Sequence, residues 1–441
     1  MKVIIIGAGL TGLSAAENLK NKLDRIFEKD LSCGGLAQTK ELHGNFRHDI
    51  TGHFLHLHDD KIEKKVHELF KNSDSKLLQV ERKSYVFRNN TFIPFPFQSH
   101  LNYLPDDIRK ECILGFLKSL ESNKTKSHNF HEWMIARYGD GITEYFMRPY
   151  NEKIWKYPLK EIKSDVVRRF FPDPSPEEII AGALSDRISV KGYNAVFYYP
   201  QRGISELTAR FMGKIDDKKI FTETEVKKVL INKKRIITDK KEEFDYDYLI
   251  STCPLKELVL KIIEPKPRRL TAYAEKLRHT SVLNINLEWK GTPGKKVPKG
   301  THWLYFPEKK YLFYRVGFLP AVSEKMAPKG CFSCYTEIAY KENYLPSTHK
   351  KWMSIAETVK EQLKEAGIIP KGVNIHNGPI EPIKYAYVLY DDNWKKARTY
   401  ILSRLEEKGI FSGGRYGAWE YSSMDQAIKW GEKLAKKCVK K

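Results

Sequence analysis

Residues 2–12 read Lys2-Val3-Ile4-Ile5-Ile6-Gly7-Ala8-Gly9-Leu10-Thr11-Gly12, an apolar run followed by three glycines. The apolar run predicts a buried parallel strand, and the sequence after the glycines predicts a helix. The glycines allow a tight turn, a close approach of backbone N–H groups to a pyrophosphate, and close packing of the helix on the strand. A pyrophosphate would lie at the positive N-terminal end of that helix. We therefore predict a dinucleotide site whose binding residues are Gly7, Gly9, Leu10, Thr11 and Gly12.

Two further features follow within the first 39 residues. Glu28 ends a second strand-like run about 20 residues after the first glycine, where a carboxylate accepts hydrogen bonds from a ribose. The next segment, Gly34-Gly35-Leu36, resembles the glutathione-reductase-like flavoproteins, whose second glycine pair approaches FAD. The resemblance favours FAD over NAD and adds Gly34, Gly35 and Leu36 to the expected cofactor contacts, beside Glu28. The alternative is a glycine-rich turn that binds no ligand.

Composition limits the classes of protein that the chain can represent. Its 441 residues are enough for two or three domains, and no apolar stretch of about 18 residues occurs, so we expect no membrane insertion. Because the first strand occupies the place of an export signal, a cytoplasmic location is the default expectation. The net charge of +22 is mostly dispersed lysine, so we expect no nucleic-acid partner. Six scattered cysteines predict neither a disulfide framework nor a metal site.

The order of elements predicts an α/β fold with a divided nucleotide-binding domain. The strand-like run at 243–252 resembles the strand that rejoins the nucleotide-binding sheet in FAD proteins, so a large insertion separates it from the first strand. Apolar spacing predicts helices at 60–72, 105–121, 129–147 and 176–185, and antiparallel strands at 281–289, 303–306, 312–318 and 331–340. The predicted domains are a Rossmann-like FAD-binding domain at 1–58, 200–255 and 400–441, a mainly helical domain at 59–185, and an antiparallel-sheet substrate domain at 186–199 and 256–399.

Seven short segments combine arginine, tyrosine and histidine with rigid turns. They are Thr51-Gly52-His53, Pro94-Phe95-Pro96-Phe97-Gln98, Phe146-Met147-Arg148-Pro149-Tyr150-Asn151, Tyr193-Asn194-Ala195, Trp303-Leu304-Tyr305-Phe306-Pro307-Glu308, Phe313-Tyr314-Arg315 and Gly414-Arg415-Tyr416-Gly417-Ala418-Trp419-Glu420-Tyr421. In this order, and over nearly the whole chain, they resemble the UDP-galactopyranose mutases, most of all the eukaryotic type. The chain departs from the family pattern at Thr51, where a second glycine is usual, and at Phe95, where eukaryotic members have tyrosine.

The resemblance implies a role for each matching residue. Arg148 and Arg315 match the positions that grip the substrate diphosphate, a task that suits the planar fork of arginine. With His53, which the family places against the flavin ring, they form the expected catalytic set. The expected substrate contacts are Phe95, Phe97 and Gln98 for uracil, Asn194 in the flap region, and Tyr305, Tyr387 and Tyr421 for the phosphates. The remaining expected cofactor contacts are Arg415, Asp425 and Gln426.

The same resemblance implies a flavin-dependent isomerase that interconverts UDP-galactopyranose and UDP-galactofuranose. In such enzymes N5 of the reduced flavin forms an adduct with the sugar, which is covalent catalysis by a cofactor. NADPH is the expected reductant, and Arg82 is similar to a position that contacts it. Two alternatives remain, an FAD-dependent oxidase or dehydrogenase of the amine-oxidase or protoporphyrinogen-oxidase type, and a non-catalytic FAD-binding protein. The sequence leaves open which UDP-sugar is the substrate and what the oligomeric state is.

Overall fold

The computed structural model describes residues 1–41, 44–121, 127–168, 171–185 and 195–440. Strand β1 (Val3–Ile6) lies at the centre of a five-stranded parallel sheet with the order β20-β13-β1-β2-β9. The other strands are β2 (Leu23–Phe27), β9 (Ile220–Phe221), β13 (Tyr248–Ser251) and β20 (Ile410–Ser412). The pairing of β1 with β13 confirms that a distant segment rejoins the first strand. This parallel sheet confirms the predicted Rossmann-like α/β fold.

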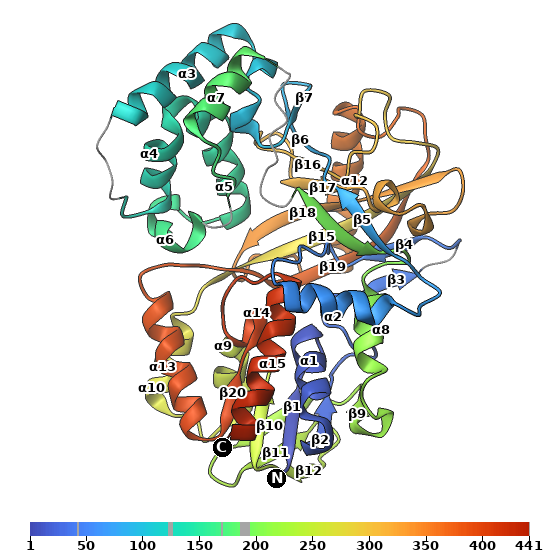
Figure 1. Cartoon of the computed structure of the whole chain (residues 1–441), viewed down its shortest axis with the longest axis vertical. Helices are drawn as coiled ribbons and strands as arrows, with labels where there is room; N and C mark the ends of the chain where they lie inside the picture. The colour runs from blue at the N-terminus through green and yellow to red at the C-terminus, as the bar shows by residue number, and fades with distance from the viewer. Residues whose placement is uncertain (42–43, 122–126, 169–170, 186–194, 441) are drawn as a thin grey trace.

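Helix α1 (Leu10–Leu19) packs against the last helix, α15 (Met424–Lys440), so the two ends of the chain lie side by side (Figure 1). The Ser14 hydroxyl donates to the Ile428 carbonyl oxygen at 2.8 Å. A Cβ on Gly431 would lie 2.6 Å from that of Ser14, so only glycine permits this helix spacing. Helices α2 (Asp60–Phe70) and α8 (Ser205–Met212) complete the layer on this side of the sheet.

A seven-stranded mixed sheet forms the second layer of strands, with the order β19-β15-β18-β17-β16-β6-β7. Its strands are β6 (Ser84–Arg88), β7 (Thr91–Pro94), β15 (His279–Lys290), β16 (Trp303–Tyr305), β17 (Arg315–Gly317), β18 (Cys331–Lys341) and β19 (Ile375–Val388). All pairs are antiparallel except β6 with β16, which is parallel. Four of these strands correspond to the predicted ones, while β6, β7 and β19 were not predicted.

The helical part of the molecule lies beside this mixed sheet (Figure 1). Its helices are α3 (Asp106–Glu121), α4 (Phe130–Ile142), α5 (Arg148–Trp155), α6 (Ser164–Val167) and α7 (Pro176–Leu184).

The structure differs from the prediction at residues 77–94, which the sequence pattern places in the mainly helical domain. They form β5 (Leu77–Glu81), β6 and β7, and the last two extend the mixed sheet. Asn89 and Asn90 have positive φ and close the β6–β7 hairpin, a conformation that asparagine tolerates well.

The remaining elements connect these layers. They are β3 (Thr39–Glu41) paired with β4 (Arg47–Asp49), β8 (Val196–Pro200) paired with β5, β10 (Val226–Leu230), β11 (Arg235–Thr238), β12 (Glu243–Asp245) and β14 (Ile263–Glu264) in a small sheet, and helices α9 (Leu255–Glu257), α10 (Arg268–Glu275), α11 (Leu319–Val322), α12 (His349–Glu365), α13 (Trp394–Glu407) and α14 (Gly414–Gly417). Within the described ranges, no helix combines the length and apolar character needed to cross a bilayer.

Candidate active site

The glycine turn between β1 and α1 has the close packing that its sequence predicts. Gly7 has φ +92°, and a Cβ on Gly12 would lie 2.0 Å from the Gly7 carbonyl oxygen. Gly9 begins α1 without a side-chain cap, and a Cβ there would meet protein atoms only at 3.9 Å and beyond. The free space at Gly9 and the uncapped helix start form a cradle that fits a pyrophosphate. The site therefore fits the dinucleotide cofactor.

The second glycine pair and Glu28 complete this cradle. The Gly34 N–H donates to the Ala8 carbonyl oxygen at 2.8 Å, and Gly34 forms a parallel bridge with Gly9. Glu28 accepts a 2.8 Å bond from the Ala8 N–H, and its burial raises the pKa of its carboxyl against the effect of its backbone hydrogen bonds. Leu36 packs against the core beside them.

Leu10 and Thr11, two residues of α1 predicted to bind the cofactor, use their side chains for contacts with the rest of the protein. The Thr11 hydroxyl donates to the Ala427 carbonyl oxygen of α15 at 3.0 Å. Leu10 is buried in the core. The side chains of Leu10 and Thr11 therefore hold the helix in place, and what they offer a cofactor is the backbone of its first turn.

The segment after β20 brings the C-terminal residues to the same region. Arg415 donates to the carbonyl oxygens of Ser422 at 3.1 Å and Ala386 at 2.8 Å. Asp425 is buried at the start of α15 and accepts from the His58 N–H at 3.3 Å. Gln426 is exposed, and its side-chain oxygen accepts from the Ser423 N–H at 3.2 Å, which caps the helix.

His53 lies on a loop with an unusual backbone. Thr51 has φ +70°, a region that a β-branched residue rarely occupies. A Cβ on Gly52 would lie 2.1 Å from the Tyr335 hydroxyl, so a glycine is needed there. Burial, together with the nearby charge of Arg415, lowers the pKa of His53 to about 4, so its imidazole is neutral at physiological pH. Its Nδ1 is buried and has no hydrogen-bond partner among the described residues, as expected of a group that faces a ligand.

Arg315 lies on β17 beside the strand that carries Tyr305. Its Nε and Nη2 donate to both carboxylate oxygens of Glu337 on β18, at 2.9 and 2.7 Å. Glu337 is buried, whereas the Arg315 side chain keeps about a quarter of its surface exposed, 24%. The carboxylate therefore holds the guanidinium in a fixed orientation and leaves part of it open to a ligand.

Arg82 approaches the same place from the segment before β6. Its guanidinium lies over the Phe95 ring at 4.2 Å and the Trp303 ring at 4.7 Å. It donates to the Tyr305 hydroxyl at 2.8 Å. The Tyr150 ring of α5 meets Tyr305 edge-on, with 5.2 Å between the ring centroids.

Three further tyrosines, Tyr314, Tyr387 and Tyr421, lie between Arg315 and Arg415. The hydroxyls of Tyr314 and Tyr387 are 3.3 Å apart, and Tyr387 stacks on Tyr421 with ring centroids 5.9 Å apart. The Arg415 guanidinium lies 4.3 Å from the Tyr421 ring. Burial raises the pKa of Tyr387 to about 12, so its hydroxyl remains a hydrogen-bond donor at neutral pH. We call this set the arginine–tyrosine cluster, and its members are Arg82, Tyr150, Tyr305, Tyr314, Arg315, Glu337, Tyr387, Arg415 and Tyr421.

The three residues predicted to hold uracil separate into two environments. Phe95 contacts the cluster through Arg82 and Tyr305. Phe97 is fully buried and stacks on Phe146 of the helical part at 5.0 Å. Gln98 is also buried, and its Nε2 donates to the Pro172 carbonyl oxygen at 3.3 Å. In the structure, Phe97 and Gln98 therefore join this loop to the helical part.

Arg148 is not brought into the arginine–tyrosine cluster. It forms an ion pair with Glu144 one helical turn earlier, and its side chain is 37% exposed. Tyr150, two residues later on the same helix, faces the cluster instead. Because positions two apart on a helix face different directions, Tyr150 faces the cluster in this structure while Arg148 pairs with Glu144 outside it. Asn194 lies outside the described residues.

The structure adds residues that sequence reasoning did not place in the site. Tyr150, Tyr314 and Glu337 are the main ones, and Tyr335 packs between Gly52 and Gly317. Tyr150 and Tyr314 lie within the quoted motifs, so their spacing offered a signal. Glu337 follows from no motif, because only the pairing of β17 with β18 brings it opposite Arg315.

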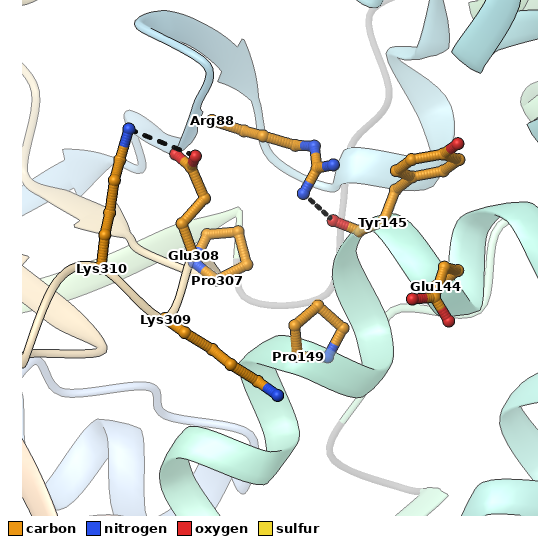
Figure 2. A pocket seen from close by; sticks show the side chains of 8 residues that line it. All are labelled: Arg88, Glu144, Tyr145, Pro149, Pro307, Glu308, Lys309 and Lys310. Atoms are coloured by element: carbon orange, nitrogen blue, oxygen red, sulfur yellow. Dashed lines mark hydrogen bonds and ion pairs between the residues drawn. The ribbon is translucent and has the colours of Figure 1, made fainter.

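A surface pocket of about 360 Å³ lies outside the cluster (Figure 2). Arg88 donates to the Tyr145 carbonyl oxygen there, and the Lys310 ammonium pairs with Glu308 at 3.4 Å. The other lining residues are Glu144, Pro149, Pro307 and Lys309. Within the described part of the chain, no group of three or more His, Cys, Asp or Glu side chains is arranged to hold a metal ion.

Comparison with known proteins defines the class. The chain belongs to the family of flavin containing amine oxidoreductases, whose model matches residues 10–438. Family membership and the glycine cradle support FAD as the cofactor.

Among solved structures, the chain is similar to a reduced UDP-galactopyranose mutase at 26% identity, covering 100% of this chain and 95% of that one, with a TM-score of 0.90. It is also similar to a putative protoporphyrinogen oxidase from Exiguobacterium sp. 255-15 at 14% identity, covering 99% and 98% of the two chains, with a TM-score of 0.71. A putrescine oxidase bound to putrescine matches at 14% identity over 100% of both chains, with a TM-score of 0.64. The last two likenesses show the fold alone.

Proposed function

We propose that this chain is a flavin-dependent mutase that interconverts UDP-galactopyranose and UDP-galactofuranose, with NADPH as the reductant of its FAD. The observation that carries the proposal is the arginine–tyrosine cluster. Arg82, Arg315 and Arg415 converge with tyrosine hydroxyls beside the His53 loop. A diphosphate ester is an anion with several acceptor oxygens, and guanidinium and phenol donors are its natural partners.

The residues of the chain would act mainly on the nucleotide. When bound, reduced FAD supplies a nucleophilic ring nitrogen for the anomeric carbon. Arg315, held in place by Glu337, binds the diphosphate and offsets the charge that grows as UDP leaves the sugar. The hydroxyls of Tyr387 and Tyr421 donate to the phosphate oxygens. Neutral His53 offers Nδ1 to the flavin side of the site without adding a charge.

Three features of the structure support this proposal over an amine or protoporphyrinogen oxidase. The full-length likeness to a UDP-galactopyranose mutase has the higher TM-score, 0.90 against 0.71 and 0.64. An oxidase that binds an apolar or amine substrate has no use for several cations at the substrate side of the flavin. Hydrogen bonds also fix the positions of two of these cations, Arg82 to the Tyr305 hydroxyl and Arg315 to the Glu337 carboxylate.

The test is turnover of UDP-galactofuranose by the holoenzyme, reduced with dithionite and kept anaerobic. We expect UDP-galactopyranose to appear with the reduced protein and not with the oxidised protein, as measured by chromatography of the nucleotide sugars. A reduced, flavin-loaded protein that forms no UDP-galactopyranose would refute the mutase. Anaerobic bleaching of the flavin by an amine would instead identify an oxidase. Bleaching by NADPH tests the reductant separately.

A further inference from the structure

Lys153 is a buried lysine on α5 that makes three hydrogen bonds to one loop. The residue is only 7% exposed. Its Nζ donates to the carbonyl oxygens of Phe306 at 2.8 Å, Glu308 at 3.1 Å and Phe313 at 2.5 Å. All three acceptors belong to the segment between β16 and β17, which we call the 306–313 loop. The single ammonium of Lys153 thus links three backbone carbonyl groups of the loop to helix α5.

Both ends of the 306–313 loop carry members of the arginine–tyrosine cluster. Tyr305 precedes it, and Tyr314 and Arg315 follow it. The Phe306 N–H donates to the Tyr314 carbonyl oxygen at 2.9 Å, which pairs the two ends. Any shift of the loop therefore moves the Tyr305 hydroxyl and the Arg315 guanidinium together.

Helix α5 reaches the cluster on either side of Lys153. Tyr150, one turn before, meets Tyr305 edge-on, and Trp155, two residues after, meets Tyr387 with ring centroids 6.1 Å apart. The three bonds of Lys153 join this helix to the loop between those contacts. The surface pocket of Figure 2 is lined by other residues of the same loop, among them Glu308 and Lys310, which pair with each other.

The hydrogen bonds of Lys153 require its charge. An ammonium has three N–H donors for the three carbonyl oxygens, whereas a neutral amine has two and turns a lone pair toward the third. The net pKa of Lys153 is lowered to about 7, mainly by burial and to a smaller extent by neighbouring Lys156, while the Glu308 carboxylate acts in the opposite direction. Charge loss near neutral pH would therefore remove one of the bonds.

We propose that Lys153 is a positioning residue for the UDP-sugar site: its ammonium holds the 306–313 loop against α5 and thereby sets where Tyr305 and Arg315 meet the diphosphate. The inference rests on the proposed function and deepens it. Lys153 touches neither substrate nor cofactor in this role, since it acts through the loop.

The experiment compares Lys153→Met with Lys309→Met in the oxidised holoenzyme. Lys309 is an exposed lysine of the same loop, so the control removes an equal charge without removing the three bonds. We expect Lys153→Met to weaken binding of UDP-galactose by about tenfold or more in calorimetry, because buried charge-assisted bonds are lost. Lys309→Met should stay close to the wild type. Both variants should keep the flavin content and flavin spectrum of the wild type.

The pH profile separates positioning from a merely structural role. The diphosphate of UDP-galactose is esterified at both ends and does not titrate near neutral pH, so we expect wild-type affinity to fall between pH 6.5 and 8.5 and the affinity of Lys153→Met to stay flat. If Lys153→Met does not fold, Lys153→Gln, which keeps two N–H donors, takes its place under the same criteria. Equal affinity of variant and wild type at every pH, or an unchanged pH profile in the variant, overturns the inference. A wild type that binds no UDP-galactose overturns the proposed function as well.

Discussion

At the scale of single residues, Arg315 is the position of the candidate site where another cationic side chain is least able to replace the native one. Its Nε and Nη2 are occupied by Glu337, so the rest of its planar fork faces the open side. A lysine at this position has one ammonium and cannot bind Glu337 and a diphosphate with the same geometry. We expect Arg315→Lys to weaken UDP binding about tenfold to a hundredfold while the flavin remains bound.

The matched control for this prediction is Arg148→Lys, which retains the ion pair with Glu144 on the outer face of α5. It should bind UDP as the wild type does. Calorimetry with UDP measures both variants, and the flavin absorbance gives the occupancy. Equal losses in the two variants would return Arg148 to the diphosphate site and contradict the geometry of the cluster.

Thr51 carries backbone strain next to His53. Its φ of +70° costs a β-branched residue about 1–3 kcal/mol, whereas glycine adopts this conformation freely. Glycine also loses more chain entropy on folding, so the net gain from Thr51→Gly should be about 1 kcal/mol or less. We expect a small rise in the thermal midpoint for Thr51→Gly and none for Thr51→Ala, which keeps the unfavourable φ. A lower midpoint for the glycine variant would show that Thr51 makes compensating contacts.

At the scale of elements, the β1–α1 turn contains glycines with two different roles: Gly12 allows the helix to pack on the turn, and Gly9 leaves space for a ligand. A Cβ on Gly12 would meet the Gly7 carbonyl oxygen at 2.0 Å, whereas a Cβ on Gly9 would meet no protein atom closer than 3.9 Å. Gly12→Ala should therefore lower both the stability of the apoprotein and its affinity for FAD. Gly9→Ala should leave the thermal midpoint of the apoprotein unchanged and weaken FAD binding alone, because its methyl group occupies the space for the pyrophosphate.

Thermal unfolding of the apoproteins and fluorescence titration with FAD measure these two effects separately. An apoprotein of Gly9→Ala as unstable as that of Gly12→Ala would contradict the assignment of that space to a ligand.

Elements also show what the sequence was able to predict and what it was not. The strand, glycines and helix of residues 2–19 form a local unit whose pattern is complete in the sequence, and the structure confirms it. Strand β19 contains charged residues and two prolines, so its pattern was not that of a strand, and its pairing with β15 depends on the rest of the sheet. Glu337 entered the cluster through the register of β17 and β18, which no local motif records.

At the scale of the whole molecule, buried histidines connect stability to pH. His302 is 4% exposed, and its Nδ1 accepts a 3.0 Å bond from the Lys83 N–H, which requires the neutral ring. Burial, with Lys83 and Arg82, lowers its pKa to about 4. The unfolded chain therefore binds more protons between pH 6.5 and 4, so the stability from this group is complete above pH 6.5 and falls as the solution is acidified.

The expected size of this effect is about 2 kcal/mol between pH 7 and pH 5. His302→Asn keeps an acceptor near the Lys83 N–H and does not titrate, so its stability should fall less over this range. Thermal midpoints of both proteins at the two pH values measure the difference. Parallel declines would show that His302 is not a source of the acid sensitivity.

The strand order of the parallel sheet also determines when the sheet can form during synthesis of the chain. Its central strand β1 emerges first, β13 emerges after half of the chain, and the edge strand β20 ends at Ser412, shortly before α15 packs on α1. The cofactor cradle therefore cannot form until β13, β20 and α15 have been made, and until then the apolar residues of β1 remain uncovered. Chains truncated before residue 410 lack β20 and α15, so we expect them to fail to acquire flavin, as flavin absorbance of the purified truncated protein would show.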